Sequence, residues 1–287
     1  MALTGDGGDE SFAGYDFRYV PHALEDAARR WIPERAGPAL GWLGGRWPRH
    51  RRLPRPLRVG TVLDNLSRDP VSAYYSDLAF LKPADARALM GLSPHRDPTH
   101  SPIYGAVTEP YRRCPSRDAV QRAEYADLKV YLPNDPLVKV DRMSMAHSLE
   151  VRCPFLDRRV VELAFRIPAP KRQRGTVGKW LLRRLAAQRL PPEVTAMAKR
   201  GFTAPVAEWI AGAGAARFRD EVLSTRSRVA DLLDASCLGR WFEEHRTGQA
   251  NHSYALWAGW VLERWLREFA DSRLESNRHL QPAVRSR

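Results

Sequence analysis

Long apolar runs are absent from this sequence. No stretch of about 18 consecutive apolar residues occurs in the 287-residue chain, which excludes an ordinary transmembrane helix. The first residues, MALTGD, contain neither a basic segment nor a long apolar segment, so the sequence shows no secretory signal peptide. We therefore expect a cytoplasmic protein without a membrane partner.

Cysteine is scarce. The three cysteines, Cys114, Cys153 and Cys237, lie far apart and form no CxxC pair. An odd number of scattered thiols excludes a disulfide framework and the usual structural zinc spacings. We expect reduced, partly buried thiols.

Lysine is scarce too. Only six of the 46 basic residues are lysines, and the remainder are arginines, a bias that we attribute to a GC-rich genome. The formal net charge is +13, and the densest basic run covers 46–58. That run contains several prolines, has no helical period and has no known nucleic-acid module around it, so we expect no nucleic-acid partner. Each lysine is correspondingly more informative, because it is a compact charge on a flexible stem.

Strand patterns are also rare. Ala2 and Leu3 end a predicted strand before a Gly-rich turn, and the Pro-rich segments 33–58 and 93–116 are interpreted as irregular. Apolar periodicity predicts helices over 21–31, 117–132, 137–148, 177–189 and 253–270. The tryptophan stripe of the last helix is interpreted as core, and the tail 271–287 as disordered. The chain is predicted to be mostly α-helical with a remnant of sheet at its N-terminus.

The Gly-rich turn carries three carboxylates, Asp6, Asp9 and Glu10, within TGDGGDE. A glycine turn between a strand and a helix lets the backbone approach phosphates closely. Carboxylates fit beside phosphates when Mg²⁺ lies between them. An EF-hand loop fails at Ser11 and Phe17, and the GK[ST] ending of a Walker A loop is missing. A plain acidic surface turn remains the alternative.

Three further segments combine charge with helical spacing. Asp135, Lys139 and Arg142 share one face of the predicted helix 137–148, whose apolar residues lead us to expect that both faces are covered. Lys179 follows two glycines near a predicted helix N-terminus, where it can reach an anionic ligand. Lys199 belongs to a basic turn, KRGFTAP.

Taken together, these segments have a familiar order. The loop reads TGDGGDESFAGY, the central block LPNDPLVKVDRMSMAHSLEVRCPFLD, and the two later segments GKWLLR and KRGF. In this order they resemble the synthetase domain of glutamine-dependent asparagine synthetases over most of the chain. The resemblance implies an α/β fold of the PP-loop ATP pyrophosphatase type (adenine nucleotide alpha hydrolase-like). Residues 1–270 would form the C-terminal portion of the asparagine synthase domain.

The resemblance also implies a reaction and a set of site residues. The family activates the side-chain carboxylate of aspartate with MgATP, then forms the amide with ammonia from glutamine, releasing AMP and pyrophosphate. By matched position it implies catalytic residues Asp6 and Lys179; ATP or pyrophosphate contacts at Thr4, Gly5, Gly7, Lys139, Arg142, Lys179, Arg183 and Lys199; Mg²⁺ ligands Asp9 and Glu10; and substrate contacts at Asp141 and Arg152.

Two departures from the family pattern matter. Met197 stands where the family often has an arginine, and neither an SGGxDS pyrophosphate loop nor a glutaminase domain with cysteine after the initial methionine occurs here. We expect a fragment or truncated reading frame that is inactive alone and requires a glutaminase domain and an SGGxDS segment as partners. A relative acting on another carboxylate (surface polysaccharide, lasso peptide or β-lactam type) and a non-catalytic helical subunit remain alternatives. The oligomeric state stays open.

Overall fold

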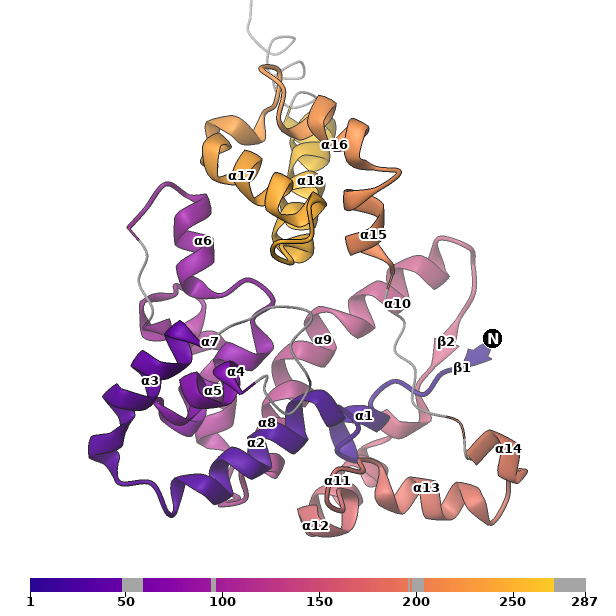
Figure 1. Ribbon diagram of the computed structural model, residues 1–287. Coiled ribbons are helices and arrows are strands. Elements are labelled where there is room, and N and C mark those ends of the chain that lie inside the picture. Colours follow the sequence, from indigo (N-terminus) through magenta and orange to yellow (C-terminus); the bar gives the residue numbers. More distant parts are fainter. Residues whose placement is uncertain (48–58, 94–96, 196, 198–203, 271–287) are drawn as a thin grey trace, which may run out of the picture. The chain divides into compact units, whose positions relative to one another are not determined.

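The computed structural model describes residues 1–47, 59–93, 97–195, 197 and 204–270 (Figure 1). These residues form two compact units. Unit 1 comprises the described residues of 1–49, 53–78 and 98–200, and unit 2 those of 79–97 and 201–287. The predicted domain over 1–270 therefore contains two compact units, and the predicted tail over 271–287 lies outside the described residues.

Unit 1 is helical apart from one small sheet. Strands β1 (Ala2–Leu3) and β2 (Val151–Arg152) pair in parallel, with Ala2 opposite Val151 and Leu3 opposite Arg152. This agrees with a mostly helical chain that starts on a strand. The helices of unit 1 are α1 (Gly8–Ser11), α2 (Asp16–Arg29), α3 (Gly37–Arg46), α4 (Gly60–Leu66), α5 (Pro70–Leu78), α7 (Tyr104–Arg113), α8 (Ala119–Ala126), α9 (Leu132–Asn134), α10 (Pro136–Met145), α11 (Arg158–Arg166), α12 (Ala169–Arg172), α13 (Trp180–Ala187) and α14 (Pro192–Thr195), with the π-helix η4 (Asp127–Tyr131) and the 3-10 helices η1 (Glu34–Ala36), η3 (Pro98–His100) and η5 (Pro154–Leu156).

Several helix starts follow local sequence chemistry. Asp118 caps α8 by accepting the Gln121 backbone N–H at 2.9 Å. Asp157 caps α11 in the same way, by accepting from the Arg159 N–H at 2.9 Å, as aspartate often does at a helix start. Asp135 occupies the N-cap position of α10, but its side chain makes no capping hydrogen bond there.

Two segments predicted to be irregular contain helices. The 33–58 segment includes α3, whose Pro38 lies in the first turn, where its missing N–H costs nothing. The 93–116 segment includes α7, which buries Tyr104, Val107, Thr108 and Tyr111 at helical spacing despite an internal proline. Burial of this apolar face outweighs the helix-breaking effect of proline, so the two interpretations as irregular segments were wrong in these stretches.

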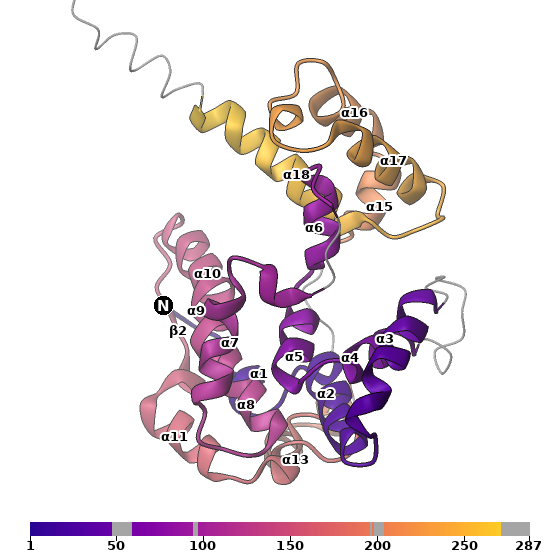
Figure 2. The same cartoon turned by 90° about the vertical axis from the view of Figure 1, so that its left-hand side faces the viewer.

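The core of unit 1 lies among α2, α5, α7 and α8 (Figure 2). Aromatic side chains dominate it: the rings of Tyr74 and Tyr111 stack with centroids 5.2 Å apart. Its fully buried members come from all four helices and include Tyr19, Tyr74, Tyr111, Ala123 and Ala126. Tyrosines in a core need partners for their hydroxyls, and buried carboxylates supply several of them.

Asp127, at the start of η4, is the central buried acceptor of unit 1. Its carboxylate accepts from Arg18 Nη1 at 2.7 Å, from Tyr19 Oη at 2.6 Å and from Tyr74 Oη at 2.8 Å. Both Asp127 and Arg18 are almost fully buried. Three donors from α2 and α5 thus converge on one residue of the α8–η4 segment and fix these helices together.

Unit 2 contains α6 (Pro83–Leu89), α15 (Val206–Ala211), α16 (Ala215–Val222), η6 (Val229–Asp231), α17 (Ala235–Arg246), α18 (Ser253–Trp265) and the π-helix η7 (Leu266–Ala270). Its core includes Leu256 and Trp260 from α18, and the ring of Phe218 stacks on that of Phe242 at 4.9 Å. The prediction of a tryptophan core is correct for Trp260 only, because Trp257 and Trp265 are 36% and 52% exposed. No helix in the described part of the chain is long and apolar enough to cross a membrane.

Replacing Asp127 with alanine should destabilise the protein by about 3–5 kcal/mol, because Arg18 would be left as an uncompensated buried charge. Urea unfolding followed by circular dichroism measures the loss. The matched control is Arg30→Ala, which breaks an exposed pair with Asp26 (3.5 Å) and should cost less than about 0.5 kcal/mol. Equal losses in the two variants would contradict the central place of Asp127.

Candidate active site

The acidic loop starts where β1 ends. The Ala2 and Thr4 backbone N–H groups donate to the carbonyls of Glu150 and Arg152 at 2.8 and 2.9 Å, which ties the loop to β2. Thr4 Oγ1 then donates to Asp6 Oδ2 at 2.8 Å. The strand therefore fixes where the loop begins, and the threonine fixes the direction of its first carboxylate.

Glycine is required at the turn itself. Gly7 has φ of +85°, a conformation that residues with a Cβ rarely adopt. A Cβ at this position would also overlap the side chain of Leu156, whose Cγ would lie at 2.7 Å. A Cβ on the next residue, Gly8, would make a tight contact of 3.3 Å with the ring of Phe155. The Gly7–Gly8 pair thus lets the loop settle on the Pro154–Leu156 turn of the central motif.

Asp9 and Lys179, which are 170 positions apart in the sequence, meet at the loop. Lys179 Nζ lies 3.1 Å from Asp9 Oδ1, and the side chains are 27% and 25% exposed. The Lys179 backbone N–H also donates to the Phe12 carbonyl at 3.0 Å. Lys179 has φ of +52°, so α13 starts only at Trp180, three residues later than predicted. An ion pair accessible to ligands therefore joins two of the predicted site segments.

Two further glycines permit this close approach. A Cβ on Gly14 would overlap the Asp9 carboxylate and the Lys179 stem, and would lie 2.8 Å from Asp9 Cα. A Cβ on Gly178 would overlap the Ala13 carbonyl and the Asp16 carboxylate, to which the Gly178 N–H donates at 2.9 Å. The Gly175–Lys179 turn therefore lies directly against the segment that follows the loop.

Glu10 faces the interior. It is 1% exposed, and its Oε1 accepts from Tyr15 Oη at 2.6 Å. Burial raises the pKa of Glu10 from its ordinary value, and the Tyr15 hydrogen bond opposes that effect. Because Glu10 is buried and hydrogen-bonded to Tyr15 while Asp6 and Asp9 are partly exposed, the geometry favours Asp6 and Asp9 over Glu10 as accessible oxygen ligands.

The charged residues of α10 and β2 are exposed. Lys139 Nζ lies 3.9 Å from Asp135 Oδ1, with side chains 65% and 52% exposed, and Asp141 and Arg142 also face solvent. Arg152 Nε donates to Glu150 Oε1 at 2.6 Å. These residues stay predicted ATP or substrate contacts.

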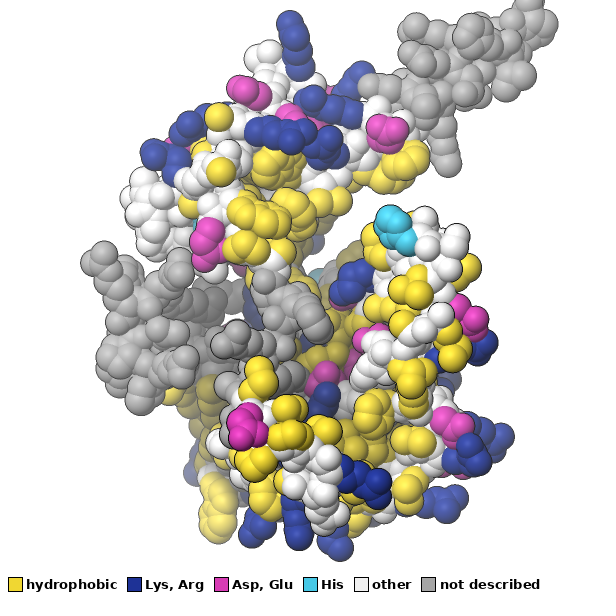
Figure 3. Space-filling model, turned by 90° about the vertical axis from the view of Figure 1, so that its right-hand side faces the viewer, with side chains coloured by type: hydrophobic (Ala, Val, Ile, Leu, Met, Phe, Trp, Pro, Cys, Tyr) yellow, Lys and Arg dark blue, Asp and Glu magenta, His cyan; other side chains and the backbone are white. Residues whose placement is uncertain are grey.

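The expectation that both faces of α10 are covered is wrong. None of its residues is buried, and Met143 and Met145 are 62% and 57% exposed. Hydrophobic side chains lie open on the face of unit 1 that carries α10 and the two strands (Figure 3).

The remaining predicted residues divide into two groups. Arg183 Nε donates to the Gly178 carbonyl at 3.2 Å, so this guanidinium supports the turn that presents Lys179. Lys199 lies outside the described residues. Met197, where the family often has arginine, is 60% exposed.

Sequence reasoning missed a buried ion pair behind the loop. Arg172 Nη1 lies 2.7 Å from Glu124 Oε2, both side chains are fully buried, and the same nitrogen donates to the Ser11 carbonyl at 3.2 Å. Burial raises the pKa of Glu124 to about 8, while Arg172 opposes the shift. Glu124 and Asp127 lie three residues apart on a helix face otherwise occupied by Val120 and alanines. Carboxylates on an otherwise apolar helix face were the signal in the sequence that could have indicated a buried ion pair.

Comparison with protein families agrees with this architecture. Residues 1–267 match the family model described as asparagine synthase. A Mycobacterium tuberculosis (strain H37Rv) relative named "Putative asparagine synthetase (glutamine-hydrolyzing)" is 30% identical over 266 residues, covering 92% of this chain and 39% of the relative. Bacillus subtilis asparagine synthetase (glutamine-hydrolyzing) 1 is 26% identical, covering 92% of this chain and 40% of the relative. The Gibberella zeae protein named amidase chry2 is 25% identical, covering 73% and 33%.

The chain belongs to the asparagine synthase family. It spans about two fifths of the length of the Mycobacterium tuberculosis and Bacillus subtilis relatives. Family membership implies a ligase domain that uses ATP. No solved structure matches the chain at a significant level.

Gly14→Ala should lower stability by about 1–3 kcal/mol, because the added methyl group would push Asp9 and Lys179 apart. The control is Gly105→Ala in α7, where nothing lies within 4 Å of the added Cβ and alanine favours the helix by up to about 1 kcal/mol. Urea unfolding of both variants checks the difference. A Gly14→Ala protein as stable as the control would show that the close approach is not required.

Proposed function

We propose that this chain forms one wall of the adenylation site of an asparagine-synthetase-type amidoligase. The complete enzyme would use ATP to adenylate the side-chain carboxylate of aspartate, then form asparagine with ammonia derived from glutamine, releasing AMP and pyrophosphate. The observation that carries the proposal is the Asp9–Lys179 ion pair at the acidic glycine loop, inside a chain of the asparagine synthase family.

The chemistry explains why such a wall is needed. A carboxylate is a poor acyl donor until its oxygen becomes a good leaving group, and attack on the α-phosphorus of ATP achieves this. Negative charge then builds on the departing pyrophosphate, and a cation fixed nearby stabilises that charge. Lys179 would be this cation, and its backbone hydrogen bond to Phe12 and its ion pair with Asp9 support that role.

Asp6 and Asp9 suit a magnesium ion brought in with ATP. Mg²⁺ usually binds through one or two carboxylates plus substrate phosphates and water. Within the described residues, no group of three or more His, Cys, Asp or Glu side chains forms a protein-only metal site. The two loop carboxylates would hold such an ion, which would neutralise phosphate charge. Thr4 orients Asp6 for this by its 2.8 Å hydrogen bond.

A second candidate keeps the adenylation chemistry but changes the acceptor. The match to a relative named as an amidase supports considering other carboxylates. ATP–pyrophosphate exchange by a full-length homologue, measured with aspartate and with polysaccharide or peptide carboxylates, distinguishes the two. Exchange that depends on aspartate favours the first candidate.

The isolated 287-residue chain should release little or no pyrophosphate from ATP in the presence of aspartate and ammonium, because its sequence has no SGGxDS pyrophosphate loop. A coupled pyrophosphate assay tests this. Turnover on the order of 1 s⁻¹ or faster, which is typical of enzymes, would contradict it.

Lys179→Met should weaken pyrophosphate binding by the isolated chain about tenfold or more, since a charged partner is worth roughly 1.5–3 kcal/mol. Isothermal titration calorimetry with magnesium pyrophosphate measures the change. Lys171→Met, which removes an exposed lysine from α12, serves as the control and should bind as the parent chain does. Equal weakening in both variants would indicate a general charge effect.

A further inference from the structure

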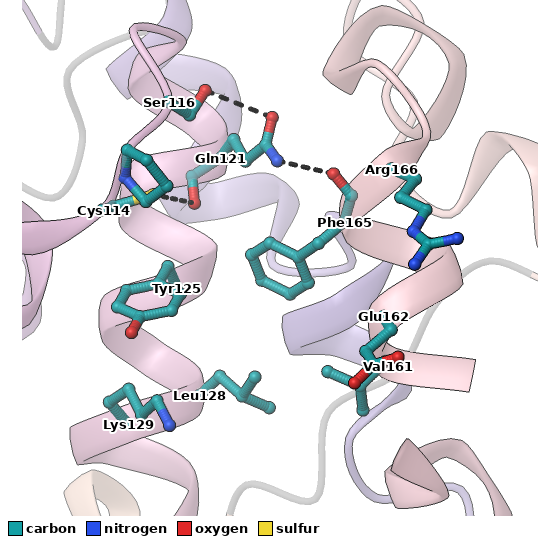
Figure 4. A pocket seen from close by; sticks show the side chains of 11 residues that line it. Cys114, Ser116, Gln121, Tyr125, Leu128, Lys129, Val161, Glu162, Phe165 and Arg166 are labelled. Atoms are coloured by element: carbon teal, nitrogen blue, oxygen red, sulfur yellow. Dashed lines mark hydrogen bonds between the residues drawn. The ribbon is translucent and has the colours of Figure 1, made fainter. Parts of the chain in front are cut away.

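Unit 1 contains a pocket that the proposed reaction does not use. It has a volume of about 410 Å³ and lies between the α8–η4 segment and α11 (Figure 4). Tyr125 and Leu128 come from the first wall, and Val161 and Phe165 from the second. Figure 4 shows the Phe165 ring directed into the space between the walls. Small-molecule sites commonly have volumes of about 300–1,000 Å³ and mostly apolar walls.

The two walls are joined at one end of the pocket. Gln121 Nε2 donates to the Phe165 carbonyl at 2.8 Å, and Ser116 Oγ donates to Gln121 Oε1 at 3.2 Å (Figure 4). The rings of Tyr125 and Phe165 meet edge to face, 6.1 Å apart. The hydrogen bond from Gln121 and the packing of the two rings fix the distance between the walls, so the pocket is formed without a ligand.

Charge at the rim is unequal. Glu162 is already bonded to Arg158 Nε at 2.7 Å, so its negative charge is compensated. Lys129 is exposed, lies 5.7 Å from the Tyr125 ring centroid, and has no carboxylate partner in the described part of the chain. Arg166 adds a second cation to the lining. An apolar cavity with a cationic rim complements a ligand with an apolar body and one negative charge.

We propose that this pocket binds a small amphipathic carboxylate. Its hydrocarbon part would lie among Leu128, Val161 and Phe165, and its carboxylate would pair with Lys129. None of the residues that line the pocket belongs to the acidic loop or to the turn that carries Lys179. Leu128 and Lys129 line the pocket, whereas Asp127 on the same π turn faces the core. This second site therefore stands whether or not the proposed adenylation is correct.

A homologous series tests the proposal. Calorimetric titration of the chain with butanoate, hexanoate and octanoate should give affinities that rise roughly fourfold per added CH₂ group, because each buried methylene contributes about 0.8 kcal/mol. Octanol and octylamine, which match octanoate in length but lack its negative charge, should bind at least about threefold more weakly. Binding that ignores chain length, or that is as tight for octylamine as for octanoate, would overturn the proposal.

Two variants locate the site. Lys129→Gln should clearly reduce the preference for octanoate over octanol, with Arg166 left as the remaining cation of the lining, whereas Lys171→Gln removes an equal charge from α12 and should leave the preference intact. Val161→Trp should fill the pocket and eliminate octanoate binding while circular dichroism remains that of the parent. If Val161→Trp unfolds, the lysine pair decides: equal behaviour of Lys129→Gln and Lys171→Gln overturns the assignment.

Discussion

The site of this chain depends on carboxylates buried on a single helical segment. Glu124 of α8 pairs with Arg172, which in turn holds the Ser11 carbonyl, and Asp127 of η4 accepts from Arg18 and Tyr19. Buried charges are costly unless they are paired, so few other arrangements of these helices would keep both carboxylates satisfied. They fix α2, which follows the acidic loop, and α12, which precedes the turn that carries Lys179.

Glycine residues allow the acidic loop and the turn that carries Lys179 to approach each other closely. Gly14 and Gly178 leave no space for a Cβ, and Gly7 requires a positive φ. The acidic loop and the turn carrying Lys179 consequently touch through backbone as well as through the Asp9–Lys179 pair. The ion pair alone would hold the ammonium group only weakly beside the Asp9 carboxylate, because the two side chains are still 27% and 25% exposed and solvent-accessible ion pairs contribute little.

The sequence predicted the parts of this site that are local or that follow a motif. Asp157 at a helix start, the strand before the loop and the lysine beside a helix N-terminus were all predictable from short-range chemistry. The pairing of Glu124 with Arg172 was not, because it joins residues 48 positions apart whose meeting depends on the tertiary fold. The expected burial of α10 was wrong for a related reason: apolar composition predicts a preference for burial, and it does not say which other segment provides the cover.

The α8–η4 segment connects the two sites through its opposite faces. Glu124 and Asp127 point into the core, whereas Gln121, Tyr125 and Leu128, spaced by four and three residues, line the pocket. A helix has enough circumference for both stripes, and a π turn, which is frequent at functional sites, lies where Asp127 and Leu128 diverge. A ligand that wedges between this segment and α11 would press on the residues that anchor α2. Asp127 with its three donors, and Glu124 with Arg172 and the Ser11 carbonyl, are the two sets of contacts that join this segment to the elements beside the loop.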